Sequence, residues 1–271
     1  MISFRNVYHA YTKGRERIET FSGLSLFIEK GKFISIAGPN GSGKTTFLKL
    51  IRGLELPEKG EVLVDGISTV SSEFETFAAR NIGFLLEDPR LQLIAPVVEE
   101  DILFSLENFC FSRDEAEQRL NWVLNLLEIE HLRKASVENL SEGEIQRVAI
   151  AGVLVLKPSL ILSDESTSWL DLKTALEVIN IYRQLCAHGI TVIHVTHQPR
   201  EMVLSDELLV LAGKVVAASG DPRTVFRETR RLANLSINVP LVSLLTEELS
   251  LRGLKIKHPL LFAEELSQWL N

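Results

Sequence analysis

The sequence predicts an α/β fold: antiparallel strands at the N-terminus, a mainly parallel sheet carrying helices, an inserted helical block and a small helical extension at the end. Three observations predict it. Apolar strand-like segments alternate with helical ones, which is the pattern of parallel sheets. From about Val97 to Leu156 the apolar spacing is helical. After Gly220 prolines separate short amphipathic segments, and the acidic excess of the preceding chain disappears.

These changes of character predict two parts. Residues 1–220 form the main domain, with a helical subdomain at about 88–158, and residues 221–271 form an extension. The extension carries 7 Lys and Arg against 6 Asp and Glu, whereas the whole chain has a formal charge of −7. We expect the extension to pack on the core or to serve in dimerisation.

The N-terminal part predicts strands broken by one glycine-rich loop. The loop is Gly38–Thr45, and the apolar spacing after it predicts a helix over Thr46–Leu54 that Gly53 closes. Lys30-Gly31 is the turn between the first two predicted strands. The strand candidates are Leu24–Glu29, Lys32–Ala37, Glu61–Val64 and Ile82–Leu86.

The rest of the chain predicts helices around two further strands. Ser112 and Glu115 match a capping box ahead of an apolar helix face. The strands expected after that block are Leu160–Ser163 and Thr191–Thr196, and the helices are Leu170–His188, Val242–Arg252 and Leu261–Leu270.

Composition excludes several classes of protein. The 271 residues are 45% apolar and 24% charged, which supports a folded core and excludes a disordered chain. Two cysteines without zinc spacing are typical of a reducing cytosol. The acidic balance argues against nucleic acid as a partner. The N-terminus does not match a signal peptide, and no apolar run approaches the roughly 20 residues that cross a bilayer.

The glycine-rich loop carries a phosphate-binding pattern. Gly38-Pro-Asn-Gly-Ser-Gly-Lys44-Thr45 fits G-x-x-x-x-G-K-[ST] between a predicted strand and a predicted helix. Glycines let backbone N–H groups converge on phosphate oxygens, and the helix start adds its positive dipole end. Lys44 is expected to reach the β- and γ-phosphates, and the Thr45 hydroxyl to bind Mg²⁺.

A second acidic element follows the apolar strand at Leu160. Asp164 and Glu165 end this strand, which places them at the carboxyl edge of the sheet where open α/β sheets bind ligands. Asp164 is expected to hold Mg²⁺, and Glu165 to orient and deprotonate the water that attacks the γ-phosphate.

Between these elements lies Leu140-Ser-Glu-Gly-Glu-Ile-Gln-Arg147, leading into an apolar helix. With the phosphate loop, Asp164-Glu165, Ser168–Asp171 and His197 in this order, residues 1–220 resemble an ABC-type ATPase. In this family the segment that corresponds to Leu140–Arg147 is called the signature. The resemblance implies a head-to-tail dimer in which the signature helix of each chain closes over the ATP of its partner. It also implies that Ser168–Asp171 is the D-loop, that His197 contacts the γ-phosphate and that Tyr11 stacks on adenine.

Three of these residues also have a purely structural interpretation. Tyr11 is equally a core strand residue, His197 a strand-end histidine and Asp171 a helix cap. The residues expected to act are Glu165, His197 and Lys44 in catalysis; Tyr11, Asn40, Gly41, Ser42, Gly43, Lys44, Thr45, Thr46, Ser141 and Gly143 in nucleotide binding; and Thr45, Glu87 and Asp164 in Mg²⁺ binding.

Residues 88–101, and Gly220–Phe226 followed by Val239-Pro240, resemble the ATPase subunits of energy-coupling factor (ECF) importers for vitamins and transition-metal ions. This resemblance implies three partners: a second ATPase, a membrane scaffold (T) subunit and a substrate-capturing (S) membrane subunit. It places the chain peripherally on the cytoplasmic face of the membrane. The segment 87–96 would help to receive the scaffold's helices.

The sequence departs from the family pattern at the signature, where L-S-G-G-Q is usual and Glu142 and Glu144 replace Gly and Gln. Glu144 also fits a capping box with Ser141. Glu142 places a carboxylate where a partner's γ-phosphate would sit, so we expect that site to be weakened. Glu87 occupies the position where the family has Gln, and the alternative interpretation is an ordinary glutamate of a surface loop. Ser163 and Trp169 also depart from the family pattern, and we expect these two changes to affect only the packing.

These departures predict an asymmetric heterodimer that hydrolyses ATP to drive an importer. The alternative is a nucleotide-binding subunit with little or no turnover that supports a catalytic partner. A soluble ABC ATPase of DNA repair or translation fits less well, because the chain has no sustained heptads and room for only one such domain.

Overall fold

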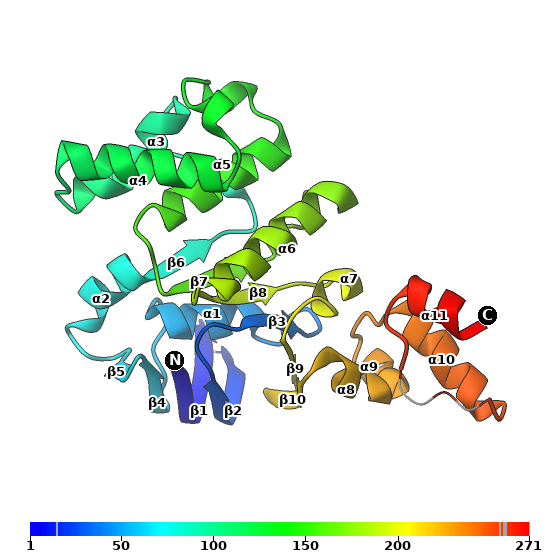
Figure 1. Ribbon diagram of the computed structural model, residues 1–271. Helices are drawn as coiled ribbons and strands as arrows, with labels where there is room; N and C mark the ends of the chain where they lie inside the picture. Colours follow the sequence, from blue (N-terminus) through cyan, green and yellow to red (C-terminus); the bar gives the residue numbers. More distant parts are fainter. Residues whose placement is uncertain (15, 255, 257–258, 271) are drawn as a thin grey trace.

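Two sheets and a layer of helices form the main body of the protein (Figure 1). The computed structural model describes residues 1–14, 16–254, 256 and 259–270. One sheet has four strands in the order β2-β1-β4-β5, and the other has six in the order β10-β9-β3-β8-β7-β6. The α/β class predicted from the sequence is therefore confirmed.

The elements alternate along the chain as the sequence predicts. The strands are β1 (Ile2–Lys13), β2 (Glu16–Ile28), β3 (Phe33–Ala37), β4 (Lys59–Val64), β5 (Ile67–Ser68), β6 (Ile82–Leu85), β7 (Leu160–Asp164), β8 (Thr191–Val195), β9 (Glu207–Ala212) and β10 (Val215–Gly220). The helices are α1 (Lys44–Arg52), α2 (Phe74–Asn81), α3 (Val98–Asn108), α4 (Arg113–Leu126), α5 (Glu142–Leu154), α6 (Leu172–Ala187), α7 (Pro199–Met202), α8 (Pro222–Val225), α9 (Thr229–Asn234), α10 (Leu241–Leu251) and α11 (Ala263–Leu270). Short 3₁₀ turns lie at Pro89–Leu91, Glu130–Leu132, Val137–Asn139 and Phe226–Glu228.

The parallel sheet brings the predicted site residues to one edge. β3, β8, β7 and β6 are neighbours and run parallel. Because the carboxyl ends of parallel strands meet at one edge, the loops after these four strands lie side by side. They carry the glycine-rich loop, His197, Asp164-Glu165 and Glu87 respectively.

The N-terminal sheet is antiparallel and longer than the sequence patterns indicate. β1 pairs with both β2 and β4, and its pairing with β2 shifts register three times. Each bulge interrupts the alternation of apolar and polar residues, so periodicity alone does not reveal these strands. The predicted segment Leu24–Glu29 overlaps the end of β2, and the turn at Lys30-Gly31 leads from this sheet into the other.

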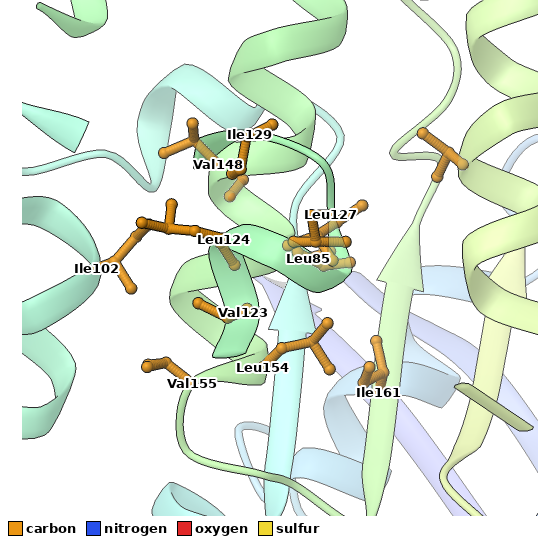
Figure 2. Packing of buried hydrophobic residues seen from close by; sticks show 14 of the residues in the cluster. Leu85, Ile102, Val123, Leu124, Leu127, Ile129, Val148, Leu154, Val155 and Ile161 are labelled. Atoms are coloured by element: carbon orange, nitrogen blue, oxygen red, sulfur yellow. The ribbon is translucent and has the colours of Figure 1, made fainter. Parts of the chain in front are cut away.

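The helices α3, α4 and α5 gather beyond the β6 end of the parallel sheet (Figure 1). Their apolar faces share one buried cluster with the sheet and with α6. Figure 2 shows Ile102, Val123 and Val148 of the three helices packed towards Leu85 and Ile161 of the strands. Each fully buried aliphatic side chain contributes about 1.5–3 kcal/mol. This apolar contact fixes the helices relative to the strands that carry the site.

The last helices pack on the outer part of the parallel sheet. Phe226, Leu232 and Ile237 share a buried cluster with Leu208 and Val210 of β9. The predicted helices Val242–Arg252 and Leu261–Leu270 correspond to α10 and α11. Residues 255, 257–258 and 271 of the predicted extension lie outside the described residues. Within the described part of the chain, no helix is both long enough and apolar enough to cross a membrane.

Helix starts differ from the sequence prediction by one or two residues: α10 begins at Leu241 rather than Val242 and α11 at Ala263 rather than Leu261, and the starts of α1 and α6 differ for local reasons. α1 begins at Lys44 rather than Thr46, because Gly43 takes the left-handed conformation that ends the loop. α6 begins at Leu172 rather than Leu170, because the Asp171 side chain caps it by accepting from the backbone N–H groups of Lys173 and Thr174. Asp171 is thus a helix cap, one of the two readings that the sequence left open.

Candidate active site

The glycine-rich loop follows β3, whose five residues are all buried. A Cβ added at Gly38 would lie 2.4 Å from Ser42 Oγ and 2.5 Å from the Leu211 carbonyl oxygen. Gly43 has a φ of +95°, and a Cβ there would lie 2.6 Å from a methyl group of Thr20. Both positions therefore require glycine, for close approach at the first and for backbone conformation at the second.

The start of α1 offers unpaired donors to an anion. Its N-cap, Gly43, makes no side-chain capping bond, and no acidic residue lies in the first turn. Among the described residues the buried Ser42 Oγ has no hydrogen-bond partner, while Asn40, Gly41 and Thr45 are exposed. A helix N-terminus with free N–H groups and an orphaned hydroxyl fits a phosphate group.

Lys44 lies folded over the loop. Its side chain is buried, and its ammonium group donates to the carbonyl oxygens of Gly38 at 3.0 Å and Pro39 at 3.2 Å. Burial lowers the pKa of Lys44, and the nearby charges of Glu165 and Asp164 oppose that shift. The ammonium is thus held at the loop, within range of the charges of the two carboxylates.

Asp164 ends β7 beside the phosphate loop. Burial raises the pKa of Asp164; a hydrogen bond from Thr45 opposes this shift, and the charges of Glu165 and Glu87 add to it. The structure therefore brings together the three residues that the sequence assigned to a metal, Thr45, Asp164 and Glu87. A partly buried carboxylate crowded by like charges, with a hydroxyl beside it, fits a hard divalent cation.

Glu165 and His197 face each other from neighbouring strands. His197 Nε2 lies 3.1 Å from Glu165 Oε1, and about a third of each side chain is exposed. Glu165 has a φ of +51°, which is rare for a residue other than glycine, and its N–H donates to the Val195 carbonyl at 3.1 Å. Such strain at a residue held by its neighbours is typical of functional sites.

Tyr11 lies against the start of α1 rather than inside the core. It is partly exposed, and its hydroxyl lies 3.2 Å from Thr46 Oγ1. Its ring contacts His9 edge-on at 4.8 Å between centroids. Tyr11 is therefore adjacent to the phosphate loop, and its stacking on adenine stays a prediction.

The signature segment begins α5 with the predicted capping box. The Ser141 N–H and hydroxyl both donate to Glu144 Oε2, at 2.8 and 2.7 Å, and the Glu144 N–H donates to Ser141 Oγ at 3.4 Å. These bonds lower the pKa of Glu144. A Cβ added at Gly143 would lie 2.6 Å from Cγ2 of Thr174, so Gly143 allows α5 to approach α6. Glu144 thus caps its own helix, which gives a carboxylate a structural role at the position where the family has Gln.

Glu142 has a cationic partner that the sequence analysis missed. Arg90 Nη2 donates to Glu142 Oε1 at 2.5 Å, with about half of each side chain exposed. Arg90 belongs to the 3₁₀ turn after β6, and 52 positions separate the two residues. The pair offsets the charge that we expected to weaken a phosphate site.

The signature does not close over the phosphate loop of its own chain. Within the described residues, no hydrogen bond or ion pair joins residues 141–144 to residues 38–45. α5 packs instead against α3, α4, α6 and β6. Ser141 and Gly143 are therefore apart from the other predicted nucleotide-binding residues in this chain.

Sequence reasoning also missed polar residues behind the site. The expectation that Ser163 varies only the packing is wrong, because its buried hydroxyl lies 2.8 Å from His194 Nδ1. A lone histidine in the apolar strand Thr191–Val195 was the one available signal. Further along the chain, Asn238 donates to the backbone carbonyl of His197 at 2.9 Å, which links the C-terminal region to this loop.

Comparisons with known proteins agree with this geometry. The family model described as ABC transporter matches residues 21–168. The energy-coupling factor transporter ATP-binding protein EcfA1 of Streptococcus pyogenes serotype M5 is 34% identical over 100% of this chain and 96% of its own length. A protein named EcfA from Streptococcus pyogenes matches to the same extent.

Solved structures show the same fold. CbiO1 from Clostridium perfringens, described as part of the ABC transporter complex CbiONQ, has a TM-score of 0.79 and 28% identity over 91% of this chain and 98% of its own. The ATP-binding cassette MJ0796, solved as a dimer with ADP and Pi, has a TM-score of 0.73 and 32% identity over 82% of this chain and 99% of its own. The chain therefore belongs to the ABC transporter family of ATP-binding, ATP-hydrolysing subunits, among the energy-coupling factor transporter ATP-binding proteins.

Proposed function

We propose that this chain is the ATP-hydrolysing subunit of an ECF-type importer and powers the uptake of a vitamin or metal ion through membrane partners. The observation that carries the proposal is the meeting of Lys44, Asp164, Glu165 and His197 at one sheet edge. The relatives named as energy-coupling factor ATPases support the importer class. The location that follows is peripheral, at the cytoplasmic face of the membrane.

The site supports a division of labour among its side chains. Free N–H groups at the start of α1 and the Lys44 ammonium would bind the β- and γ-phosphates. Thr45, Asp164 and Glu87 would hold Mg²⁺, which supplies charge neutralisation on the phosphate oxygens. Tyr11 would support the adenine from the edge of the site.

Glu165 and His197 are the groups placed to act on the water and the γ-phosphate. Glu165 would accept a proton from the attacking water, since its carboxylate is partly open to solvent at the edge of the sheet. His197, 3.1 Å away, would orient Glu165 and contact the γ-phosphate. Phosphoryl transfer to water needs little covalent chemistry, so positioning and charge supply most of the catalysis.

A complete site needs a second chain. Within the described residues, no hydrogen bond or ion pair joins the signature of this chain to its own phosphate loop, and the related cassette MJ0796 was solved as a dimer. Ser141 and Gly143 would then close over the nucleotide of a partner ATPase. With Glu142 in its signature, the chain fits one half of an asymmetric heterodimer, joined to a membrane scaffold and a substrate-capturing subunit.

The test uses the complex purified from its native cells by a tag on this chain. Glu165→Gln removes the base while keeping size and shape. We expect ATP binding to persist and ATPase activity to fall by at least about a hundredfold at sites using this loop. Unchanged activity in the Glu165→Gln complex would favour the alternative, a nucleotide-binding subunit that supports a catalytic partner.

The composition of the same complex tests the heterodimer. Native mass spectrometry should show one copy of this chain, one of a different ATPase and membrane subunits. Two copies of this chain without a second ATPase would overturn the asymmetric assembly while leaving the hydrolysis proposal standing.

A further inference from the structure

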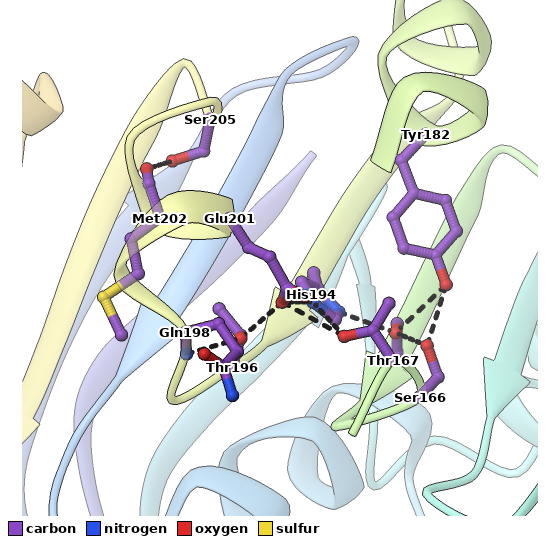
Figure 3. A network of polar contacts seen from close by, with 10 residues as sticks. Ser166, Thr167, Tyr182, His194, Thr196, Gln198, Glu201, Met202 and Ser205 are labelled. Atoms are coloured by element: carbon purple, nitrogen blue, oxygen red, sulfur yellow. Dashed lines mark hydrogen bonds and ion pairs between the residues drawn. The ribbon is translucent and has the colours of Figure 1, made fainter. Parts of the chain in front are cut away.

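A chain of buried polar side chains runs directly behind Glu165 and His197. It links Tyr182 of α6, Ser163 and Ser166 at the end of β7, His194 of β8 and Glu201 of α7 (Figure 3). Such networks are costly unless every member is paired, and here each of these side chains has a partner. The cost indicates that the network has a purpose beyond filling space.

The network is not a second catalytic centre. Ser163, His194 and Glu201 have the order of a serine-hydrolase triad, with Ser163 Oγ 2.8 Å from His194 Nδ1 and His194 Nε2 2.9 Å from Glu201 Oε2. The side chains are, however, at most 4% exposed. No substrate can reach the serine hydroxyl, so a positioning role remains.

Glu201 is the point where the network reaches the site. Its Oε2 accepts hydrogen bonds from Thr167 Oγ1 at 3.0 Å and from Thr196 Oγ1, and it lies 2.9 Å from His194 Nε2. Burial alone would raise the pKa of Glu201, but hydrogen bonds from these groups and the charge interaction with His194 outweigh it and lower the pKa. The buried, ionised carboxylate of Glu201 is thus stabilised by the hydrogen bonds that these groups donate to it.

Two of those donors belong to the loops that carry the proposed catalytic pair. Thr167 lies two residues after Glu165, and Thr196 immediately precedes His197. Thr196 Oγ1 also accepts from the Gln198 N–H at 3.0 Å, so it fixes the backbone on both sides of His197. A single carboxylate oxygen therefore joins the loop after β7 to the loop after β8.

We propose that Glu201 is a positioning residue that holds these two loops in one frame, so that Glu165 and His197 stay in contact during hydrolysis. The inference rests on the proposed roles of Glu165 and His197. Without Glu201 each loop would keep its strand but lose its tie to the other. A misplacement of about 1 Å between reacting groups can cost roughly a hundredfold in rate.

The experiment compares Glu201→Gln with wild type in the native complex. A neutral amide oxygen accepts hydrogen bonds from the same groups more weakly than a carboxylate oxygen does, which loosens the tie between the two loops. We expect kcat for ATP to fall at least about tenfold, with KM for ATP within about twofold. Ser205→Ala is the control, because Ser205 is buried beside α7 and, in the described part of the chain, its hydroxyl donates only to the Met202 carbonyl (Figure 3). It should leave kcat and KM unchanged.

A double-mutant cycle separates positioning from general stability. Thr167→Val and Thr196→Val each remove one hydroxyl at constant size. If both act by tying their loop to Glu201, either change breaks the tie, and the double variant should be no slower than the slower single variant within about twofold. These milder variants also carry the test if Glu201→Gln fails to fold.

Three results would overturn the inference. They are wild-type kcat in Glu201→Gln, a fall in kcat that Ser205→Ala matches, or fully multiplicative effects of the two threonine changes. Glu165→Gln, measured in parallel, reports on the proposed function separately. Turnover that survives Glu165→Gln refutes the role of Glu165, whereas turnover that survives Glu201→Gln refutes this inference alone.

Discussion

Arg90 and Glu142 form the contact whose removal gives the sharpest prediction. Arg90 Nη2 lies 2.5 Å from Glu142 Oε1, and both side chains are about half exposed. An exposed pair of this kind contributes only about 0.2–1 kcal/mol to folding stability. We therefore expect Arg90→Ala to change the unfolding temperature little. Its larger effect concerns the phosphate that the signature would meet in the proposed dimer.

The size of that effect follows from the charges. An unscreened carboxylate about 4 Å from a phosphate charge costs about 1 kcal/mol in water, and more as the interface dries. Removing Arg90 exposes the charge of Glu142, so Arg90→Ala should lower ATPase activity of the complex about fivefold, which corresponds to about 1 kcal/mol. Glu142→Gln removes the charge itself, so adding it to the Arg90→Ala chain should restore the activity.

The double variant decides whether the two residues act together. In the Glu142→Gln background, Arg90→Ala should change the ATPase rate by less than about twofold, because no charge is left to neutralise. Arg252→Ala, which breaks a surface pair with Glu248 on α10, is the matched control and should have no effect. An equal loss from Arg90→Ala in both backgrounds would refute the reasoning.

Three further predictions test the local geometry. Burial raises the pKa of Asp164, so the ionised side chain destabilises the fold at pH values above that pKa. Asp164→Asn should therefore raise the Tm of the nucleotide- and metal-free chain at pH 7. This gain in Tm should vanish as the pH falls through the raised pKa. Gly143→Ala should separate α5 from Thr174 and lower both Tm and ATPase activity, whereas Gly152→Ala on the same helix meets nothing within 4 Å and should stabilise the chain by up to about 1 kcal/mol. Ser141→Ala removes the cap of α5 and should cost about 1 kcal/mol, seen as a drop of a few degrees in thermal unfolding.

Local patterns in the sequence predicted the parts of the site that local chemistry determines. The phosphate loop, the strand ending in Asp164 and the capping box of Ser141 and Glu144 each lie within a few residues, so spacing is enough to find them. Glu144 follows the capping-box pattern. Its carboxylate is engaged by Ser141 of its own chain.

The remaining features depend on contacts between distant segments. Arg90 meets Glu142 across 52 positions, and Ser163 meets His194 across 31. No periodicity or motif encodes such pairs, because they arise when the loops of neighbouring parallel strands meet at the sheet edge. The sequence pattern did not predict the strand β1 for a related reason. Bulges in its pairing with β2 interrupt the alternation of apolar and polar residues.

The affinity of the native complex for MgATP, measured with wild type and with Lys44→Ala, tests most directly whether the loop over which Lys44 is folded binds the triphosphate. Lys44→Ala leaves the glycines in place and removes the side chain beyond Cβ, including the ammonium held against the Gly38 and Pro39 carbonyls. We predict that equilibrium dialysis will show one nucleotide fewer per copy of this chain in the variant. Equal nucleotide stoichiometry and affinity in the two complexes would contradict the account.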